Sequence, residues 1–175
     1  RFTPVQNTQH ESGLQNLLLH SERCIIICCE ENNVNFYGMI FYKKSPRNIT
    51  LDQAKILTEF SNKLKIKSVG VFVNHNINDL KKIISYLNLE YIQLHGNENQ
   101  SYIDEIKKQF NLKIIKKISV NNTDDLKNIN NFNNIDYLLF DYKPNQDELP
   151  GGNSKSFRNC RNITKCIWYG FRIYS

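Results

Sequence analysis

The alternation of strand and helix patterns constrains the fold of this 175-residue chain more than any other feature. Five apolar stretches are predicted to be strands, and the segments between them have the apolar spacing of helices. Strands that recur with a helix between each pair form right-handed, parallel βαβ units. The units are short, which favours a (βα)₈ barrel over a sheet with long insertions. The predicted strands are 35–42, 69–73, 91–95, 112–118 and 137–140, and the helices are 50–64, 77–87, a segment around 103–110 and a weaker one around 126–129.

Two of these elements carry specific expectations. Strand 35–42 is nearly all apolar, which predicts burial on both faces. In the helix that follows, Thr50 is a candidate N-cap. The apolar stripe of this helix is predicted to be Leu51, Ala54, Leu57 and Leu64.

The chain supplies too few strands to close a barrel of eight. Leu14 to Glu31 predicts a helix, with a further candidate strand at Cys24–Cys28, and the C-terminal part offers one strand, Cys166–Ile173. We therefore expect an α/β fold of the TIM-barrel type that is incomplete, with about five to six βα units in one domain spanning 1–175. The open edges of such a sheet favour self-association.

Composition narrows the class of partner. The net charge is +6, but lysines often stand beside Asp or Glu, so we expect a small phosphorylated substrate and no nucleic acid. There is no run of 18 or more apolar residues and no signal-peptide pattern in residues 1–20, so no membrane association is expected. The five cysteines include no CxxC pair, which argues against a zinc site. Their odd number, without a secretory signal, favours reduced thiols in the cytoplasm.

The two ends of the chain differ in composition from its middle. All five cysteines and five of the six arginines lie outside 35–157, and the middle is rich in Lys, Asn and Ile. One explanation is chance combined with a specialised terminal segment. The other is that 1–29 and 158–175 do not derive from the original barrel sequence, for instance after a change of reading frame, and that only 30–157 does.

The strongest candidate for a catalytic group is Asp141. It follows the buried strand 137–140 directly and precedes a loop rich in Pro and Gly. In parallel α/β folds the chemistry lies where strands end and loops begin. The alternative is that Asp141 only caps the next loop or helix.

Four segments in order resemble the phosphoribosylanthranilate isomerase family of tryptophan biosynthesis. They are FYGMIFYKKSPRNIT (36–50), VGVFVNH (69–75), YIQLHG (91–96) and the Phe-Asp strand end with its Leu-Pro-Gly-Gly loop. The resemblance covers about residues 30–157. It implies a TIM barrel that converts N-(5-phosphoribosyl)anthranilate to 1-(2-carboxyphenylamino)-1-deoxyribulose 5-phosphate by an Amadori rearrangement, without a metal or redox cofactor.

The resemblance also assigns roles to residues. Asp141 matches the general acid that protonates the ring oxygen, and burial at a strand end favours the protonated carboxyl group that this role needs. Arg47 matches the residue that binds the anthranilate carboxylate, for which a guanidinium fork is well suited. The implied substrate-binding residues are Arg47, Gln93, His95, Gly151 and Gly152, the last two in a loop that closes over the substrate.

The general base is missing from this pattern. The family carries Lys-x-Cys-Gly at the end of its first strand, a position that falls near Leu17 to His20, and this sequence has no Cys-Gly pair. Cys24, Cys28 and Cys29 lie in the region of the following helix, where a small buried apolar role is expected. No Ser-Gly-Gly phosphate loop follows residue 157. The alternatives are an inactive barrel fragment or interaction module, and another phosphate-binding barrel enzyme such as indole-glycerol-phosphate synthase.

Overall fold

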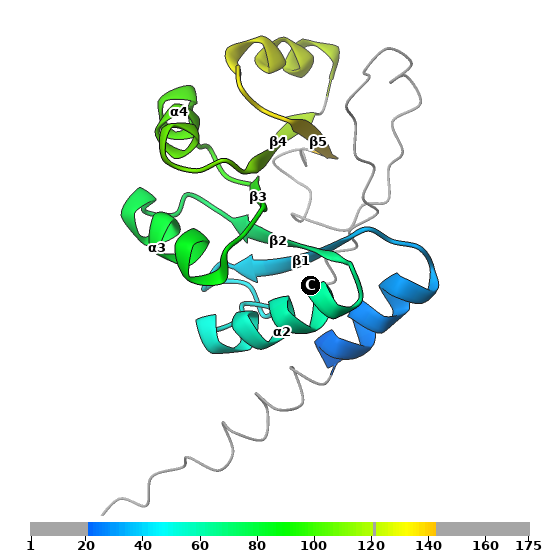
Figure 1. Ribbon diagram of the computed structural model, residues 1–175. Coiled ribbons are helices and arrows are strands. Elements are labelled where there is room, and N and C mark those ends of the chain that lie inside the picture. Colours follow the sequence, from blue (N-terminus) through cyan, green and yellow to red (C-terminus); the bar gives the residue numbers. More distant parts are fainter. Residues whose placement is uncertain (1–20, 121, 143–175) are drawn as a thin grey trace, which may run out of the picture.

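The computed structural model describes residues 21–120 and 122–142, which form an α/β fold around one parallel sheet (Figure 1). Each strand pairs in parallel with the next one along the chain, so the order is β1-β2-β3-β4-β5. This sequential order is that of a βα barrel. The strands are β1 (Phe36–Phe41), β2 (Lys67–Phe72), β3 (Tyr91–Leu94), β4 (Lys113–Val120) and β5 (Tyr137–Tyr142).

The helices cover one side of this curved sheet (Figure 1). They are α2 (Leu51–Lys63), α3 (Ile77–Leu87), α4 (Gln100–Gln109) and the 3₁₀ helix η1 (Thr123–Asn131), with a further helical stretch at 21–31. In the described part of the chain the sheet is open, with β1 and β5 as its edges. The expected incomplete TIM-barrel-type fold is therefore confirmed. None of the described helices has the length and apolar character that crossing a membrane requires.

Side-chain caps explain where the helices begin. The Thr50 hydroxyl accepts a hydrogen bond from the backbone N–H of Gln53, and the Gln53 side chain accepts one from the N–H of Thr50. The predicted cap is thus confirmed, whereas the predicted role of Leu51 is wrong, because its side chain is 42% exposed. A helical side chain leans toward the helix N-terminus, so a residue in the first turn projects past the packed layer.

The two faces of the sheet are buried to different degrees. Residues that face the helices, such as Met39, Phe72 and Ile92, are almost completely buried. On β1 the alternate residues Phe36 and Ile40 are only half-buried. The prediction that this strand is buried on both faces is wrong, because the described strands do not close around the inner face.

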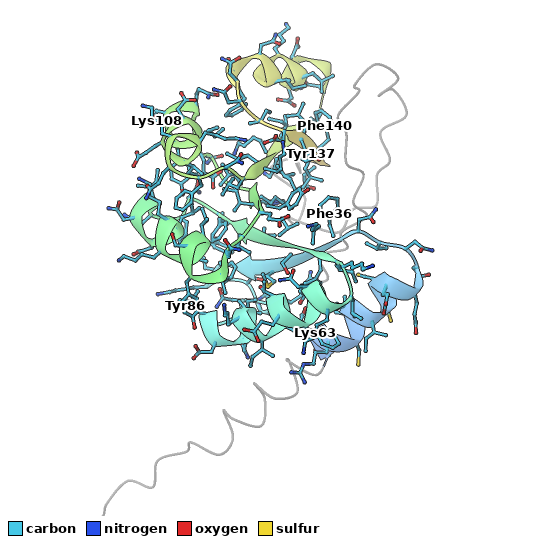
Figure 2. All side chains as sticks on the ribbon, viewed as in Figure 1. Phe36, Lys63, Tyr86, Lys108, Tyr137 and Phe140 are labelled. Carbon is cyan, nitrogen blue, oxygen red and sulfur yellow. The ribbon has the colours of Figure 1, made fainter. Side chains whose placement is uncertain are left out.

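The inner face carries its own small apolar layer at the amino ends of the strands. Val69, Ile115 and Leu139 form its buried part, and aromatic side chains surround them. Among these, Phe36 and Tyr91 make an edge-to-face contact with ring centroids 5.0 Å apart. Figure 2 shows Phe36 and Tyr137 on the side of the sheet away from the helices, whereas Lys108 projects outward from α4.

Residues 21–31 are helical, so the candidate strand at Cys24–Cys28 is wrong. Ile26 is fully buried in the main core, while Ile25 and Ile27 are 48% and 40% exposed. The three consecutive isoleucines favour a strand locally, because β-branched residues prefer strands. The burial of only the middle one fits a helix that packs one face against the core. Near its start, Glu22 accepts a hydrogen bond from the Tyr37 hydroxyl, and burial together with this bond raises the pKa of Tyr37.

An ion-pair network joins the amino ends of β4 and β5. Asp136 accepts hydrogen bonds from Lys107 at 2.7 Å, from Lys113 at 2.9 Å and from the N–H of Ile114 at 2.9 Å. Burial alone would raise the pKa of Asp136, but these donors outweigh it and hold the pKa below its usual value. This network fixes the start of β5, at the end of the barrel that typically serves stability.

Candidate active site

The carboxyl ends of the five strands lie at one edge of the sheet, because all strands run in parallel. Gln93 and Asp141 lie near the ends of β3 and β5, and His95 directly follows β3. Arg47 lies in the loop after β1, which folds back so that the N–H of Ile49 donates to the carbonyl of Ile40 at 3.1 Å. The sequence-predicted residues Gly151 and Gly152 lie outside the described residues.

Three of the predicted residues form a chain of polar contacts. Gln93 Nε2 lies 2.8 Å from His95 Nδ1, and His95 Nε2 lies 3.5 Å from Asp141 Oδ2. An amide nitrogen can only donate, so Nδ1 accepts and a neutral His95 carries its proton on Nε2, facing the carboxyl group. The His95 backbone N–H is anchored to the Phe72 carbonyl at 2.8 Å. The arrangement brings Gln93 and His95 of the β3 end next to Asp141 of β5.

Asp141 differs in two respects from its sequence-based description. It lies within β5, opposite Ser119 of β4, rather than after the strand. Its side chain is 47% exposed. Burial was expected to keep this carboxyl group protonated, but the side chain is only partly buried.

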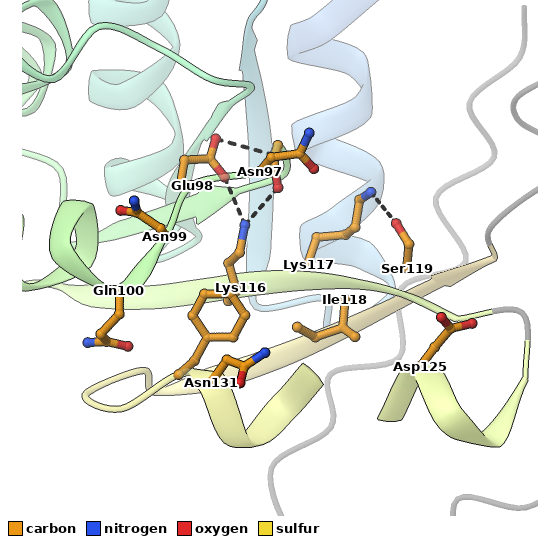
Figure 3. Close-up of a pocket in the computed structure, with 12 residues that line it drawn as sticks. Asn97, Glu98, Asn99, Gln100, Lys116, Lys117, Ile118, Ser119, Asp125 and Asn131 are labelled. Carbon is orange, nitrogen blue, oxygen red and sulfur yellow. Dashed lines mark hydrogen bonds and ion pairs between the residues drawn. The ribbon is translucent and has the colours of Figure 1, made fainter. Parts of the chain in front are cut away.

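A lysine and a serine beside these polar contacts were not predicted from the sequence. Lys117 Nζ donates to Ser119 Oγ at 2.6 Å, and Figure 3 shows the two side chains pointing toward each other from β4. Residues two apart on a strand share a face, so the Lys-x-Ser spacing was a readable signal. Both border a cavity of about 570 Å³ that is also lined by the β3–α4 loop and by η1. Desolvation lowers the pKa of Lys117, and the Asp141 charge opposes that shift.

A buried ion pair supports the β3–α4 loop. Lys116 Nζ lies 2.8 Å from Glu98 Oε2, and each side chain is only 2% exposed (Figure 3). Lys116 also donates to the Gly96 carbonyl at 2.8 Å. The other Glu98 oxygen accepts from the backbone N–H of Asn74 at 2.8 Å and from that of Gly96 at 3.3 Å. The pair thus joins the loop that follows β2 to the loop that follows β3 and carries His95.

A general base is not identified among the described residues. Cys24 and Cys28 are exposed and Cys29 is half-buried, all in the helical stretch 21–31 of the outer layer. The expected buried apolar role is therefore wrong for Cys24 and Cys28, and burial raises the pKa of the Cys29 thiol. Within the described ranges, no group of three or more His, Cys, Asp or Glu residues is placed to hold a metal ion.

Comparison with known proteins gives a consistent result. Residues 15–159 match the family model of N-(5'phosphoribosyl)anthranilate (PRA) isomerase. The curated N-(5'-phosphoribosyl)anthranilate isomerases of Rhizobium rhizogenes and Paramagnetospirillum magneticum are 43% and 35% identical over 129 residues, which is 73% of this chain. The crystal structure of mutually generated monomers of the dimeric Thermotoga maritima isomerase aligns with a TM-score of 0.57 and 28% identity, covering 64% of this chain and 56% of that one.

The chain spans 58% and 60% of the length of the two curated relatives. The matched segment contains all five described strands, including Asp141 on β5, together with the loops that carry Arg47 and His95. The resemblance read from the sequence motifs is therefore confirmed, and the chain belongs to the PRA isomerase family.

Proposed function

We propose that this chain carries the acid and substrate-binding part of a PRA isomerase site and that its reaction is the Amadori rearrangement of N-(5-phosphoribosyl)anthranilate. Asp141 donates a proton to the ring oxygen of the ribosylamine, which opens the ring. A base then removes the C2′ proton to give an enolamine, which becomes the 1-deoxyribulose when C1′ gains a proton and the C2′ hydroxyl loses one. The reaction needs no metal or redox cofactor, because each step is a proton transfer.

The single observation that carries this proposal is the Gln93–His95–Asp141 chain at the carboxyl ends of β3 and β5. His95 Nε2 lies 3.5 Å from one carboxyl oxygen of Asp141, which places the imidazole beside the proposed acid. Arg47, beyond β1, binds the anthranilate carboxylate. The family resemblance assigns Gly151 and Gly152 to the loop that closes over the substrate.

The experiment is the decay of substrate fluorescence with the purified chain and with Asp141→Asn. Loss of an essential acid costs about 10²–10⁴ in rate. We expect turnover far below that of a full-length relative, because no Lys-x-Cys-Gly base is present in the sequence, and we expect Asp141→Asn to abolish what remains. Turnover that Asp141→Asn leaves unchanged would contradict the assigned acid.

The second candidate is a catalytically inactive barrel fragment or interaction module. The observation that favours it is the open sheet that the five described strands form. This alternative predicts no turnover by the wild-type chain at any concentration. Complementation of a tryptophan auxotroph lacking the isomerase distinguishes the two, since only an active chain restores growth.

We also propose a cytoplasmic setting and self-association, with no nucleic-acid partner and a single partial barrel domain over 1–175. Self-association is supported by the open edges β1 and β5. Exposed or half-exposed lysines of the described residues pair with carboxylates, for example Lys67, Lys81, Lys82 and Lys127, which disfavours a polyanion surface. Light scattering across protein concentrations tests the association, and a strictly monomeric mass would contradict it.

A further inference from the structure

The pair formed by Lys117 and Ser119 has no role in the chemistry described so far. Both residues are half-buried and lie on the inner face of β4, because Ser119 is in register with Asp141 and Lys117 with Leu139 of the inner layer. The ammonium group donates to the Ser119 hydroxyl at 2.6 Å. The two groups therefore converge at the carboxyl end of the sheet, next to the proposed acid.

The charge of Lys117 is not neutralised within the described residues. Its neighbour in sequence, Lys116, has a carboxylate at 2.8 Å, but no described carboxylate lies within ion-pair distance of Lys117. Asp141 is near enough to act on it electrostatically. A partly desolvated ammonium group without a paired anion is unfavourable, and a bound anion would restore the lost solvation. Lys117 and Ser119 both border the adjoining cavity of about 570 Å³.

We propose that Lys117 and Ser119 form an anion subsite, which holds an anionic oxygen of the substrate beside Asp141. The inference rests on the proposed function, since the substrate class named there carries two anionic groups, a carboxylate and a phosphate. Either group matches the chemistry of the subsite: an ammonium donor and a hydroxyl donor 2.6 Å apart, which can both bind one oxyanion. Lys117 thereby adds a second cation to the one that Arg47 supplies beyond β1.

The test is an NMR titration of the full chain, following the amide signals of Lys117 and Ser119. The two probes are anthranilate, which has a carboxylate and no phosphate, and ribose 5-phosphate, which has a phosphate and no carboxylate. A charge-assisted hydrogen bond corresponds to about tenfold or more in affinity. We expect Lys117→Gln to weaken one probe by about that factor, and Lys117→Arg to retain its binding.

The matched control is Lys108→Gln, on the outer surface of α4, which should bind like the wild type. Lys117→Gln keeps a polar group that can reach Ser119, and the amide spectrum reports whether each variant is folded. Weakened anthranilate identifies a carboxylate subsite, and weakened ribose 5-phosphate identifies a phosphate subsite. A wild-type chain that binds neither probe, or a Lys117→Gln chain that binds both unchanged, overturns the inference. The decay of substrate fluorescence is measured in parallel. Absent turnover with intact anion binding means that the proposed function fails while the anion subsite stands.

Discussion

Replacing Lys116 with Met should destabilise the chain strongly, although the new side chain fits an apolar layer. In the wild type, Lys116 and Glu98 are each 2% exposed and 2.8 Å apart. Lys116→Met leaves the Glu98 carboxylate buried with its two backbone donors but without its cation. Breaking a buried pair in this way costs about 3–5 kcal/mol. That is a large part of the roughly 5–15 kcal/mol that stabilises an ordinary domain.

The assay is urea unfolding followed by circular dichroism. With a slope of about 1–3 kcal/mol/M, the midpoint should fall by about 1 M or more. The control is Lys82→Met, which breaks the pair between Lys82 and Asp79, at 3.3 Å with side chains 78% and 60% exposed. An exposed pair of this kind contributes about 0–1 kcal/mol.

A double variant isolates the electrostatic part of the effect. Lys116→Met combined with Glu98→Gln removes the buried charge while the amide oxygen still accepts from the N–H of Asn74. We therefore expect it to be more stable than Lys116→Met alone, with a coupling energy of about 0.5–3 kcal/mol. The reasoning is refuted if Lys116→Met unfolds like the Lys82 control, or if the effects of the two substitutions simply add.

Four further outcomes are expected. Gly96→Ala should cost about 1–3 kcal/mol in thermal unfolding, since its Cβ would lie 2.4 Å from Asn74 Oδ1 and 2.7 Å from the Asn74 backbone nitrogen; an unchanged transition would contradict the loop geometry. Thr50→Ala should lose about 1 kcal/mol and Thr50→Ser almost none, because only the serine retains the capping hydroxyl. The lowered pKa of Asp136 means that its carboxylate stabilises the fold above the unfolded value of about 3.9, and that this contribution is lost as the pH falls through the folded pKa. Stability measured below about pH 4 should therefore fall more steeply in the wild type than in Asp136→Asn, and equal slopes would contradict the assignment. The open sheet should unfold below about 60 °C, and a cooperative transition of the monomer above that temperature would speak against it.

The sequence by itself determined the layout of the chain. Apolar periodicity is a local property, so the order of the five strands and the start of α2 at Thr50 followed from spacing and capping alone. The parallel order then placed His95 and Asp141 at the same edge, because strands joined by helices must run in the same direction. Their roles came from the family resemblance and stay predictions.

Only the tertiary structure decided which side chains meet. Lys117 lies beside Asp141 because of the register between β4 and β5, which no single segment encodes. Glu98 reaches Lys116 because the loop after β3 folds over the strand that follows. At 24–28, where the sequence offered both a helix and a strand, the structure has a helix that buries Ile26 in the core and leaves Ile25 and Ile27 exposed. Local pattern therefore sets the elements, and contacts between residues far apart in sequence set the site.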